Sequence, residues 1–153
     1  SAIALIYNEG IVDRIATFET RLRTAEDVRE WFSDKHYPMV VVTDEGQVIA
    51  YAATSLYRPR ECYAGIGEFS VYVANRAHGC GIGHVLMQAF VPACERAGLW
   101  KLVSRIFPEN TASRALCARH GFREVGTYAR HAKLDGAWRD VLILERLLPA
   151  NLT

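Results

Sequence analysis

The spacing of apolar side chains changes several times along the chain, and each change predicts a switch between helix and strand. Near the start, Ile3, Leu5 and Ile6 recur at helical spacing. From Tyr37 onward, β-branched runs take over. The expected elements are helices over 2–11 and 24–32, strands over 39–43, 47–54 and 68–74, a helix over 83–97, a strand over 99–107, a helix over 110–120, and strands over 122–130 and 138–147.

Polar and glycine-containing segments separate these elements. Asp44-Glu45-Gly46 has the composition of a hairpin turn, and Gly98 is placed to end a helix. Asp135-Gly136 predicts a turn inside a connection wider than a tight hairpin. Pro92 falls within a helix, where we expect a kink. Because strands and helices mix without strict alternation, the order predicts a mixed α/β fold in a single domain over 1–153.

Composition narrows the classes of function. The chain has 18 basic and 17 acidic side chains, so it lacks the positive surplus that non-specific nucleic-acid binding requires. No apolar run approaches the ~20 residues that span a bilayer, and the start has no signal-peptide pattern. We therefore expect a cytoplasmic protein with neither a nucleic acid nor a membrane as partner. The four cysteines form no CxxC pair, which predicts reduced thiols rather than disulfides or a metal site.

The most informative segment is the loop between the strand over 68–74 and the next helix. It carries glycines at 79, 81 and 83. Small residues let backbone N–H groups approach an anion at a helix N-terminus, and a diphosphate is the natural ligand. A P-loop would need Lys where His84 follows the last glycine, and a dinucleotide fingerprint would need GxGxxG instead of GxGxG. A glycine-rich turn without a ligand is the remaining alternative.

The pattern Arg76-x-x-Gly79-x-Gly81-x-Gly83 resembles the acetyl-coenzyme A (acetyl-CoA) loop of the GNAT acetyltransferase superfamily. The run from Asn110 to Phe122, an N-x-x-S helix that closes in Gly-Phe, is similar to the next signature of that superfamily. Other segments resemble the phosphinothricin and methionine-sulfoximine acetyltransferases and, near the end, the arsinothricin N-acetyltransferases. These segments are Ile6–Gly10, Thr17–Glu19, Tyr57–Pro59, Glu68–Val73 and Gly136–Asp140, with Lys133–Val141 and Leu144–Leu147 for the arsinothricin branch.

The resemblance implies a GNAT fold, in which helices flank a central, mostly antiparallel sheet. The superfamily's usual first strand has no counterpart here, because the chain starts near the first helix. The implied reaction moves an acetyl group from acetyl-CoA, the co-substrate, to the α-amine of a small glutamate-analogue amino acid. It is a detoxification or antibiotic-resistance reaction of a cytoplasmic homodimer, and it needs no metal.

Acetyl transfer needs a base, because an α-amine near neutral pH is mostly ammonium. Glu68 stands beside the cofactor loop and matches the carboxylate that serves as base in the resembling family. The resemblance also implies that main-chain groups of Val71 and Val73 bind the pantetheine arm. Asn110 is a good helix N-cap residue in its own right. The full set of expected cofactor-binding residues is Val71, Val73, Arg76, Gly79, Cys80, Gly81, Ile82, Gly83, His84, Asn110 and Ser113.

For the acceptor, Arg58 is the leading candidate, because a guanidinium binds a carboxylate well. Arg60 and Glu61 share its loop and are expected to read the second acidic group and the ammonium. Lys133 and Arg139 are further candidates, acting across a dimer interface as in the relatives. Many superfamily members carry a tyrosine general acid where this chain has Cys117, so the choice between Cys117 and water stays open.

Other functions remain as alternatives. The acceptor amine could belong to a peptide N-terminus or a polyamine, although the loop Arg58-Pro59-Arg60 argues against a polyamine. A non-catalytic acyl-CoA sensor would keep the glycine loop without turnover. A nucleotide-binding module is a third alternative, which competition by ATP but not by coenzyme A would reveal.

Overall fold

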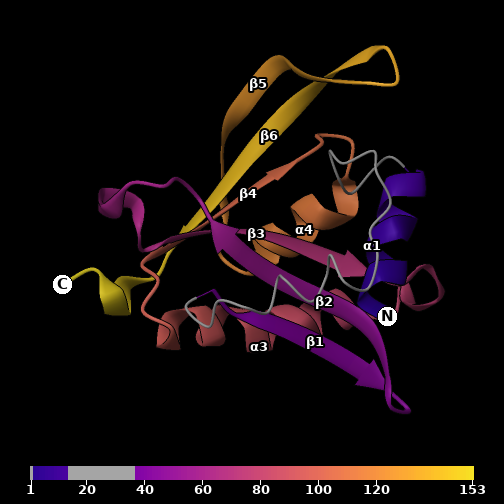
Figure 1. Ribbon diagram of the computed structural model, residues 1–153, viewed down its shortest axis with the longest axis horizontal. Coiled ribbons are helices and arrows are strands. Elements are labelled where there is room, and N and C mark those ends of the chain that lie inside the picture. Colours follow the sequence, from indigo (N-terminus) through magenta and orange to yellow (C-terminus); the bar gives the residue numbers. More distant parts are fainter. Residues whose placement is uncertain (1, 14–36) are drawn as a thin grey trace.

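The computed structural model describes residues 2–13 and 37–153, so the helix expected over 24–32 and the segment Thr17–Glu19 lie outside the described residues. Figure 1 shows the elements. In chain order they are α1 (Ala2–Asp13), β1 (Met39–Asp44), β2 (Gln47–Leu56), η1 (Glu61–Tyr63), β3 (Ile66–Val73), η2 (Asn75–Ala77), α3 (Ile82–Arg96), β4 (Lys101–Ile106), α4 (Thr111–Arg119), β5 (Arg123–Leu134), β6 (Ala137–Leu147) and η3 (Pro149–Asn151).

The described strands form one six-stranded sheet in the order β1-β2-β3-β4-β6-β5. Every neighbouring pair is antiparallel except β3 and β4, which run parallel. The expected mixed α/β architecture, a mostly antiparallel sheet flanked by helices, is confirmed. Among the described residues, no strand precedes α1.

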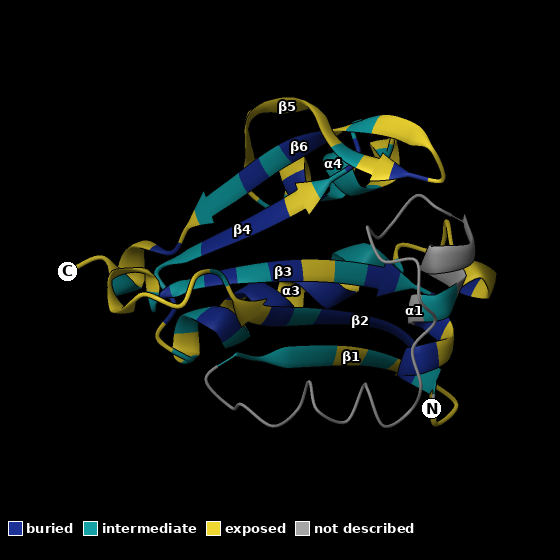
Figure 2. Ribbon diagram, turned by 45° about the horizontal axis from the view of Figure 1, so that its top comes forward, coloured by how far each residue is buried: buried dark blue, intermediate teal, exposed yellow. Residues whose placement is uncertain are grey.

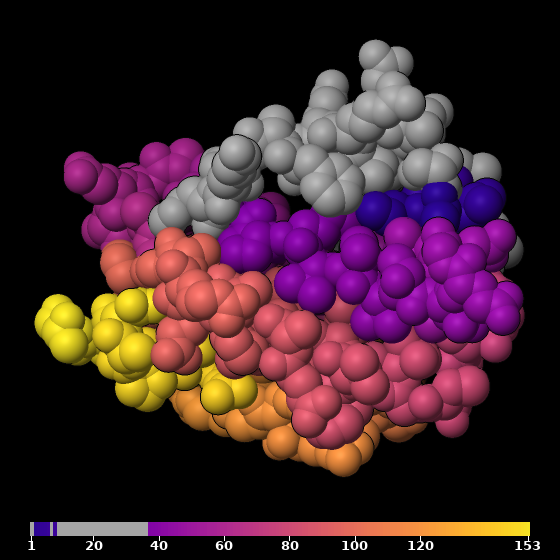
Figure 3. All heavy atoms as spheres, turned by 90° about the horizontal axis from the view of Figure 1, so that it is seen from below, coloured from indigo at the N-terminus to yellow at the C-terminus, as the bar shows by residue number. Residues whose placement is uncertain are grey.

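Alternation along the central strands separates two cores, one on each face of the sheet. Ala50 and Ala52 of β2 join the larger core with α3, whereas Tyr51 between them joins the smaller core under α1. Ile3, Ala4 and Ile6 of α1 are buried against this second face. Figure 2 shows the central strands as largely buried and β5 as largely exposed. Seen from below in Figure 3, atoms of the α3 region lie between the β1–β2 hairpin and later parts of the chain.

The helix ends follow the local signals in the sequence. The side chain of Asn110 accepts a hydrogen bond from the backbone N–H of Ser113 at 3.2 Å, which confirms it as the N-cap of α4. Gly98 has a φ of 90° just after α3, the left-handed conformation expected of a helix-ending glycine. Pro92 lies inside α3, and the helix continues past it to Arg96. The kink expected there stays a prediction.

The last hairpin corrects one expectation. β5 runs on to Leu134, which pairs directly with Ala137, so Asp135 and Gly136 form a tight two-residue turn instead of a wider connection. Both have positive φ values, 51° and 82°, the conformation that suits the twist of a hairpin. The register shifts between Tyr128 and Ala132, and this irregularity broke the alternation on which the shorter strand prediction rested.

The parallel pairing of β3 and β4 begins where Gly65 meets Trp100. The backbone N–H of Trp100 donates to the carbonyl oxygen of Gly65 at 2.8 Å. A Cβ added to the buried Gly65 would lie 2.0 Å from Cε3 of the Trp100 ring. Only glycine therefore lets the indole lie across the chain here, and the close approach fixes where the two strands come together.

We predict that Gly65→Ala lowers the free energy of unfolding by roughly 1–3 kcal/mol, because the added methyl must displace the Trp100 ring. The matched control is Gly126→Ala, since an added Cβ at Gly126 meets nothing within 4 Å. Urea unfolding followed by tryptophan fluorescence measures both. Equal stability of the two variants would contradict this account of Gly65.

Candidate active site

β3 and β4 part after a short parallel ladder. Only three residues of each strand pair, ending with Glu68 opposite Val103. β3 nevertheless continues to Val73 and β4 to Ile106. Figure 2 shows the two strands diverging beyond the paired segment. The second half of β3 thus has no strand on its β4 side.

A buried serine makes a hydrogen bond between β4 and β3 just past their last paired residues. Ser104 is 4% exposed, and its hydroxyl donates to the carbonyl oxygen of Phe69 at 3.0 Å. That carbonyl faces the side where strand pairing has just stopped, so the hydroxyl satisfies a buried acceptor. Past Phe69, the main chain of β3 presents an open edge.

The open edge presents the main chain of Val71 and Val73. The N–H of Ala74 donates to Ile49 of β2 at 2.8 Å, so Ala74 and Tyr72 direct their main-chain groups toward β2. By alternation, Val71 and Val73 direct theirs to the other side. The ring of His78 confirms this direction, because its Nε2 lies 2.8 Å from the Val73 carbonyl oxygen and donates to it. The N–H groups of the two valines are therefore directed toward the gap between the strands.

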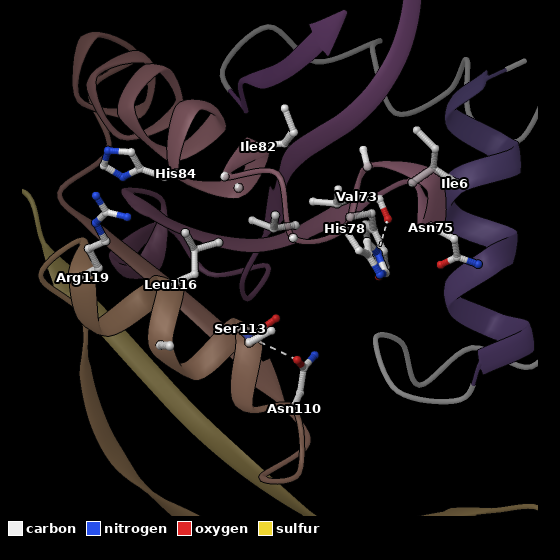
Figure 4. Close-up of a pocket in the computed structure, with 18 residues that line it drawn as sticks. Ile6, Val73, Asn75, His78, Ile82, His84, Asn110, Ser113, Leu116 and Arg119 are labelled. Carbon is white, nitrogen blue, oxygen red and sulfur yellow. Dashed lines mark hydrogen bonds between the residues drawn. The ribbon is translucent and has the colours of Figure 1, made fainter. Parts of the chain in front are cut away.

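A cavity of about 480 Å³ lies along this edge, between β3, the start of α3 and one face of α4. Figure 4 shows side chains from all three elements around it, with Ile6 of α1 at one end. Most of the expected cofactor-binding residues line it. They are Val71, Val73, Gly79, Gly81, Ile82, Gly83, His84, Asn110 and Ser113.

The three loop glycines meet two different requirements. Gly79 and Gly81 have φ values of 80° and 73°, a left-handed conformation that other residues rarely adopt. Gly83 is needed for space, since a Cβ there would lie 3.0 Å from a methyl of Leu116 on α4. Gly81 is the N-cap of α3, so the unpaired N–H groups of the first helical turn begin at the cavity wall. This arrangement suits a phosphate group.

Two expected cofactor residues lie outside the cavity. The guanidinium of Arg76 points to the β1–β2 hairpin, where its Nη2 lies 3.2 Å from Oε1 of Gln47. Arg76 and Cys80 both line a separate pocket together with Asp44. The reason is the turn η2, which begins right after β3 and carries Arg76 to the far side of the loop.

Two residues that the sequence did not single out join the cavity region. Arg119, at the end of α4, lines the cavity near His84. His120 follows it, and its Nε2 lies 2.9 Å from Nδ1 of His84. No local pattern identifies them, because the histidine pair joins residues 36 positions apart.

Glu68 occupies the last paired position of β3 and forms an ion pair with Arg105 of β4. Nε of Arg105 lies 2.5 Å from Oε1 of Glu68, and the carboxylate side chain is 19% exposed. Its neighbour Phe69 joins the core beneath α3, so Glu68 lies on the opposite face of the sheet. Glu68, the expected base, thus stands where β3 and β4 diverge, on the sheet face that does not carry the larger core. Arg105 was not anticipated, because its partner is 37 residues away.

The residues expected to bind the acceptor lie on the exposed loop between β2 and β3. Arg58 donates from Nη1 to the carbonyl oxygen of Tyr57 at 3.0 Å, and its guanidinium lies 4.6 Å from the Tyr57 ring centre. Arg60 and Glu61 are exposed on the same loop. This loop adjoins the start of β3, whereas the cavity lies along the end of that strand. Glu68 stands between the two.

Comparison with known families now gives this geometry a context. The model of the acetyltransferase (GNAT) family matches residues 6–122, which include the diverging strands, the glycine loop and α4. The chain belongs to the GNAT acetyltransferase family. It is an acetyl-CoA-dependent acetyltransferase, and acetyl-CoA is its co-substrate.

Individual relatives cover almost the whole acetyltransferase. The phosphinothricin N-acetyltransferase of Streptomyces coelicolor is 36% identical, covering 94% of this chain and 87% of its own. A GNAT phosphinothricin acetyltransferase from Sinorhizobium meliloti, solved in complex with acetyl-CoA, has a TM-score of 0.89 at 32% identity, with coverage of 96% and 82%. The ribosomal-protein-alanine N-acetyltransferase of Brucella melitensis has a TM-score of 0.91 at 32% identity, with coverage of 96% and 93%.

The chemistry of the cavity fits acetyl-CoA. A pantetheine arm carries amide groups, and the open edge at Val71 and Val73 offers main-chain partners of the kind a β-strand would use. A diphosphate suits the start of α3, where Gly79 and Gly81 leave the backbone accessible. When bound, acetyl-CoA supplies the activated thioester.

Cys117 does not share the cavity. It is 4% exposed and packs in the large core, although Leu116 beside it lines the cavity. Burial raises the pKa of the Cys117 thiol to about 11. An unperturbed cysteine thiol has a pKa of about 8.5, so burial makes Cys117 a weaker proton donor than a free cysteine. Its position and its acidity both argue against Cys117 as the general acid.

Among the described residues, no group of three or more His, Cys, Asp and Glu side chains is arranged to hold a metal ion. None of the described helices is long and apolar enough to cross a membrane. All four cysteines are free thiols, two exposed and two buried.

We predict that Ser104→Ala lowers the free energy of unfolding by about 1–3 kcal/mol, because it leaves the buried Phe69 carbonyl without a donor. Ser70→Ala, at an exposed position of β3, is the matched control and should change stability little. Chemical denaturation measures both. Equal stability of the two variants would show that the hydrogen bond from the Ser104 hydroxyl to the Phe69 carbonyl does not stabilise the end of the ladder.

Proposed function

We propose that this acetyltransferase transfers the acetyl group of acetyl-CoA to the α-amine of a glutamate-analogue amino acid of the phosphinothricin, methionine-sulfoximine or arsinothricin type. The product would no longer carry a free α-amine, so the reaction would detoxify such an antibiotic. The proposal is supported by the 36% identity to a phosphinothricin N-acetyltransferase over nearly the whole chain.

The placement of Glu68 carries the chemical part of the proposal. Its carboxylate stands where β3 and β4 part, at the meeting point of the open edge and the exposed loop. A base here would take a proton from the acceptor's ammonium, directly or through one water. The free amine then attacks the thioester carbonyl. The main-chain N–H groups at Val71 and Val73 are aimed to stabilise the oxygen on which negative charge develops.

The remaining cavity residues hold the co-substrate. The backbone from Gly79 to Gly83 binds the diphosphate, and Asn110 and Ser113 contact the pantetheine arm from α4. Arg76 and Cys80 contribute no side chain to the cavity. Because Cys117 is buried with a raised pKa, we assign protonation of the leaving thiolate to water.

The acceptor's α-carboxylate, and the second acidic group of the phosphinothricin and arsinothricin types, require cations. Arg58 and Arg60 are exposed on the β2–β3 loop, and Glu61 of that loop is available for the ammonium. Arg105 adds a third guanidinium, which is 42% exposed and bound to Glu68 through Nε. Of these three groups, the guanidinium of Arg105 is the one in contact with the proposed base.

We predict that Glu68→Gln lowers kcat/KM for acetyl transfer by about 100- to 10,000-fold while leaving the dissociation constant for acetyl-CoA unchanged. The isosteric amide keeps the shape and removes the base. Release of coenzyme A thiol is measured with phosphinothricin, methionine sulfoximine, arsinothricin, a polyamine and a short alanine peptide. Glu95→Gln, on α3 away from the cavity, is the control and should retain full activity.

The acceptor panel separates this proposal from its alternatives. Preference for the alanine peptide would replace the amino-acid acceptor by a protein N-terminus, which the likeness to the Brucella melitensis enzyme favours. Tight binding of acetyl-CoA without turnover of any amine would replace the enzyme by an acyl-CoA sensor. Full activity of Glu68→Gln would remove Glu68 as the base.

We further propose that the protein is a homodimer joined through the β5–β6 arm. β5 is the last strand of the sheet, and Figure 1 shows the hairpin projecting from the rest of the molecule. Tyr128 and Trp138 on this arm are 54% and 57% exposed. An unpaired edge with exposed aromatic side chains suits a second copy of the chain. Lys133 of the arm would then approach the partner's acceptor site. Arg139 instead pairs with Glu109 of its own chain at 3.3 Å, with its guanidinium 4.2 Å from the Phe107 ring centre.

We predict that Trp138→Arg converts the dimer to a monomer, because a charge replaces an aromatic contact at the proposed interface. Light scattering coupled to size-exclusion chromatography measures the mass. Val41→Arg, which places the same charge on the opposite edge strand, should remain dimeric. A monomeric wild-type protein, or a dimer that withstands Trp138→Arg, would contradict this interface.

A further inference from the structure

One end of the acetyl-CoA cavity is charged, whereas the rest of its lining is apolar or neutral. His84 comes from the first turn of α3 and Arg119 from the last turn of α4. Figure 4 shows these two side chains together at one end, opposite Ile6 and Asn75. Among the described residues that line the cavity, Arg119 is the one with a permanent charge. A permanent positive charge in the wall of a ligand cavity favours the binding of an anionic group there.

His120 holds the ring of His84 in place. Nε2 of His120 lies 2.9 Å from Nδ1 of His84, and the two ring centres are 4.9 Å apart. His120 is itself anchored, because its carbonyl oxygen accepts a hydrogen bond from Nη1 of Arg146 at 2.7 Å. His84 is thus held through its Nδ1, which contacts His120. Nε2 is the other polar atom of its ring.

The contact within this pair allows a donor at Nε2 of His84. Burial, together with the positive charges of His84, Arg119 and Arg146, lowers the pKa of His120 below its ordinary value. When His120 donates from Nε2 to Nδ1 of His84, the ring proton of His84 lies on Nε2, on the side away from His120. An anion at this end of the cavity selects this tautomer over the one in which Nδ1 of His84 donates and Nε2 is bare.

Coenzyme A carries two separate anionic groups, the diphosphate and the 3′-phosphate of its ribose. The backbone N–H groups at the start of α3 suit the diphosphate, and they need no cationic side chain. His84 stands three residues beyond the N-cap Gly81, roughly 4.5 Å farther along the helix axis. The side chains of His84 and Arg119 thus lie beside the backbone cradle, together at one end of the cavity, and they suit the second anion. A phosphate monoester is well suited to a guanidinium and an imidazole N–H.

We propose that Arg119 and His84 bind the 3′-phosphate of coenzyme A, with His120 as the positioning residue that keeps the Nε2 proton of His84 directed at it. This proposal rests on the assignment of the cavity to acetyl-CoA and on the glycine loop as the diphosphate site. It makes the enzyme selective for coenzyme A over 3′-dephospho-coenzyme A.

The test compares dissociation constants of coenzyme A and 3′-dephospho-coenzyme A by isothermal titration calorimetry, with no acceptor present. In the wild-type protein the dephospho form is expected to bind roughly 10- to 100-fold more weakly, the usual effect of losing charge-assisted hydrogen bonds. Arg119→Gln should weaken coenzyme A by a similar factor and leave the dephospho form unchanged. Arg96→Gln, at the far end of α3, should alter neither constant.

His120 is tested by the same ratio of dissociation constants. His120→Phe should lower the selectivity, whereas His120→Gln, whose amide can donate to Nδ1 of His84, should retain most of it. A merely structural defect would weaken both ligands equally and leave the ratio unchanged. Thermal unfolding of each variant confirms that it is folded before the titrations are compared.

Three outcomes would overturn the proposal. The first is equal binding of both ligands by the wild-type protein. The second is an Arg119→Gln variant that weakens both ligands by the same factor, as loss of a diphosphate contact would. The third is full selectivity in His120→Phe. Because no acceptor is used, inactivity toward glutamate analogues leaves this result intact. Conversely, loss of 3′-phosphate selectivity would leave the acceptor assignment untouched.

Discussion

The early end of the β3–β4 ladder is the constraint on which the rest of the site depends. Parallel neighbours normally satisfy each other's main chain along their whole length, yet here only three residues of each strand pair. Ser104 takes up the first carbonyl past the break, and the next main-chain groups face a cavity. Backbone groups in a strand edge favour hydrogen-bonding partners, and the amide groups of a pantetheine arm are of the kind that this edge suits.

Packing on the α3 side keeps the gap from closing. α4 approaches α3 so closely that Gly83 lies against Leu116, and Cys117 is buried beside it in the large core. α4 therefore forms one wall of the cavity along the open edge of β3, with Leu116 facing the cavity and Cys117 facing the core.

The divergence divides the chemistry between two regions of one site. The cavity offers neutral backbone donors with one charged end, which suits a long co-substrate that is anionic at the phosphates. At the start of the gap stands a carboxylate that is ion-paired with the guanidinium of Arg105. Glu68 thus lies between the cavity and the exposed loop that carries Arg58 and Arg60, which is why the proposed function assigns the acceptor to that side.

The features that the sequence alone determined are local ones. The left-handed glycines, the Asn110 cap, the end of α3 at Gly98 and the alternation of the central strands each depend on residues close in the chain. They were enough to predict the mixed α/β fold, the phosphate-binding loop and the position of Glu68 beside it. The outward direction of Arg76 was not predictable, because it depends on a turn of three residues and on Gln47 of a distant hairpin.

Tertiary structure alone decided the pairings across the fold. Arg105 reaches Glu68, and His120 reaches His84, over separations of 37 and 36 residues. The length of β5 likewise depended on a register shift against β6 that no alternation rule reveals. Periodicity records only which face of an element is apolar. Which side chains meet depends on strand order and on where a ladder stops, and both follow from contacts between segments far apart in the chain.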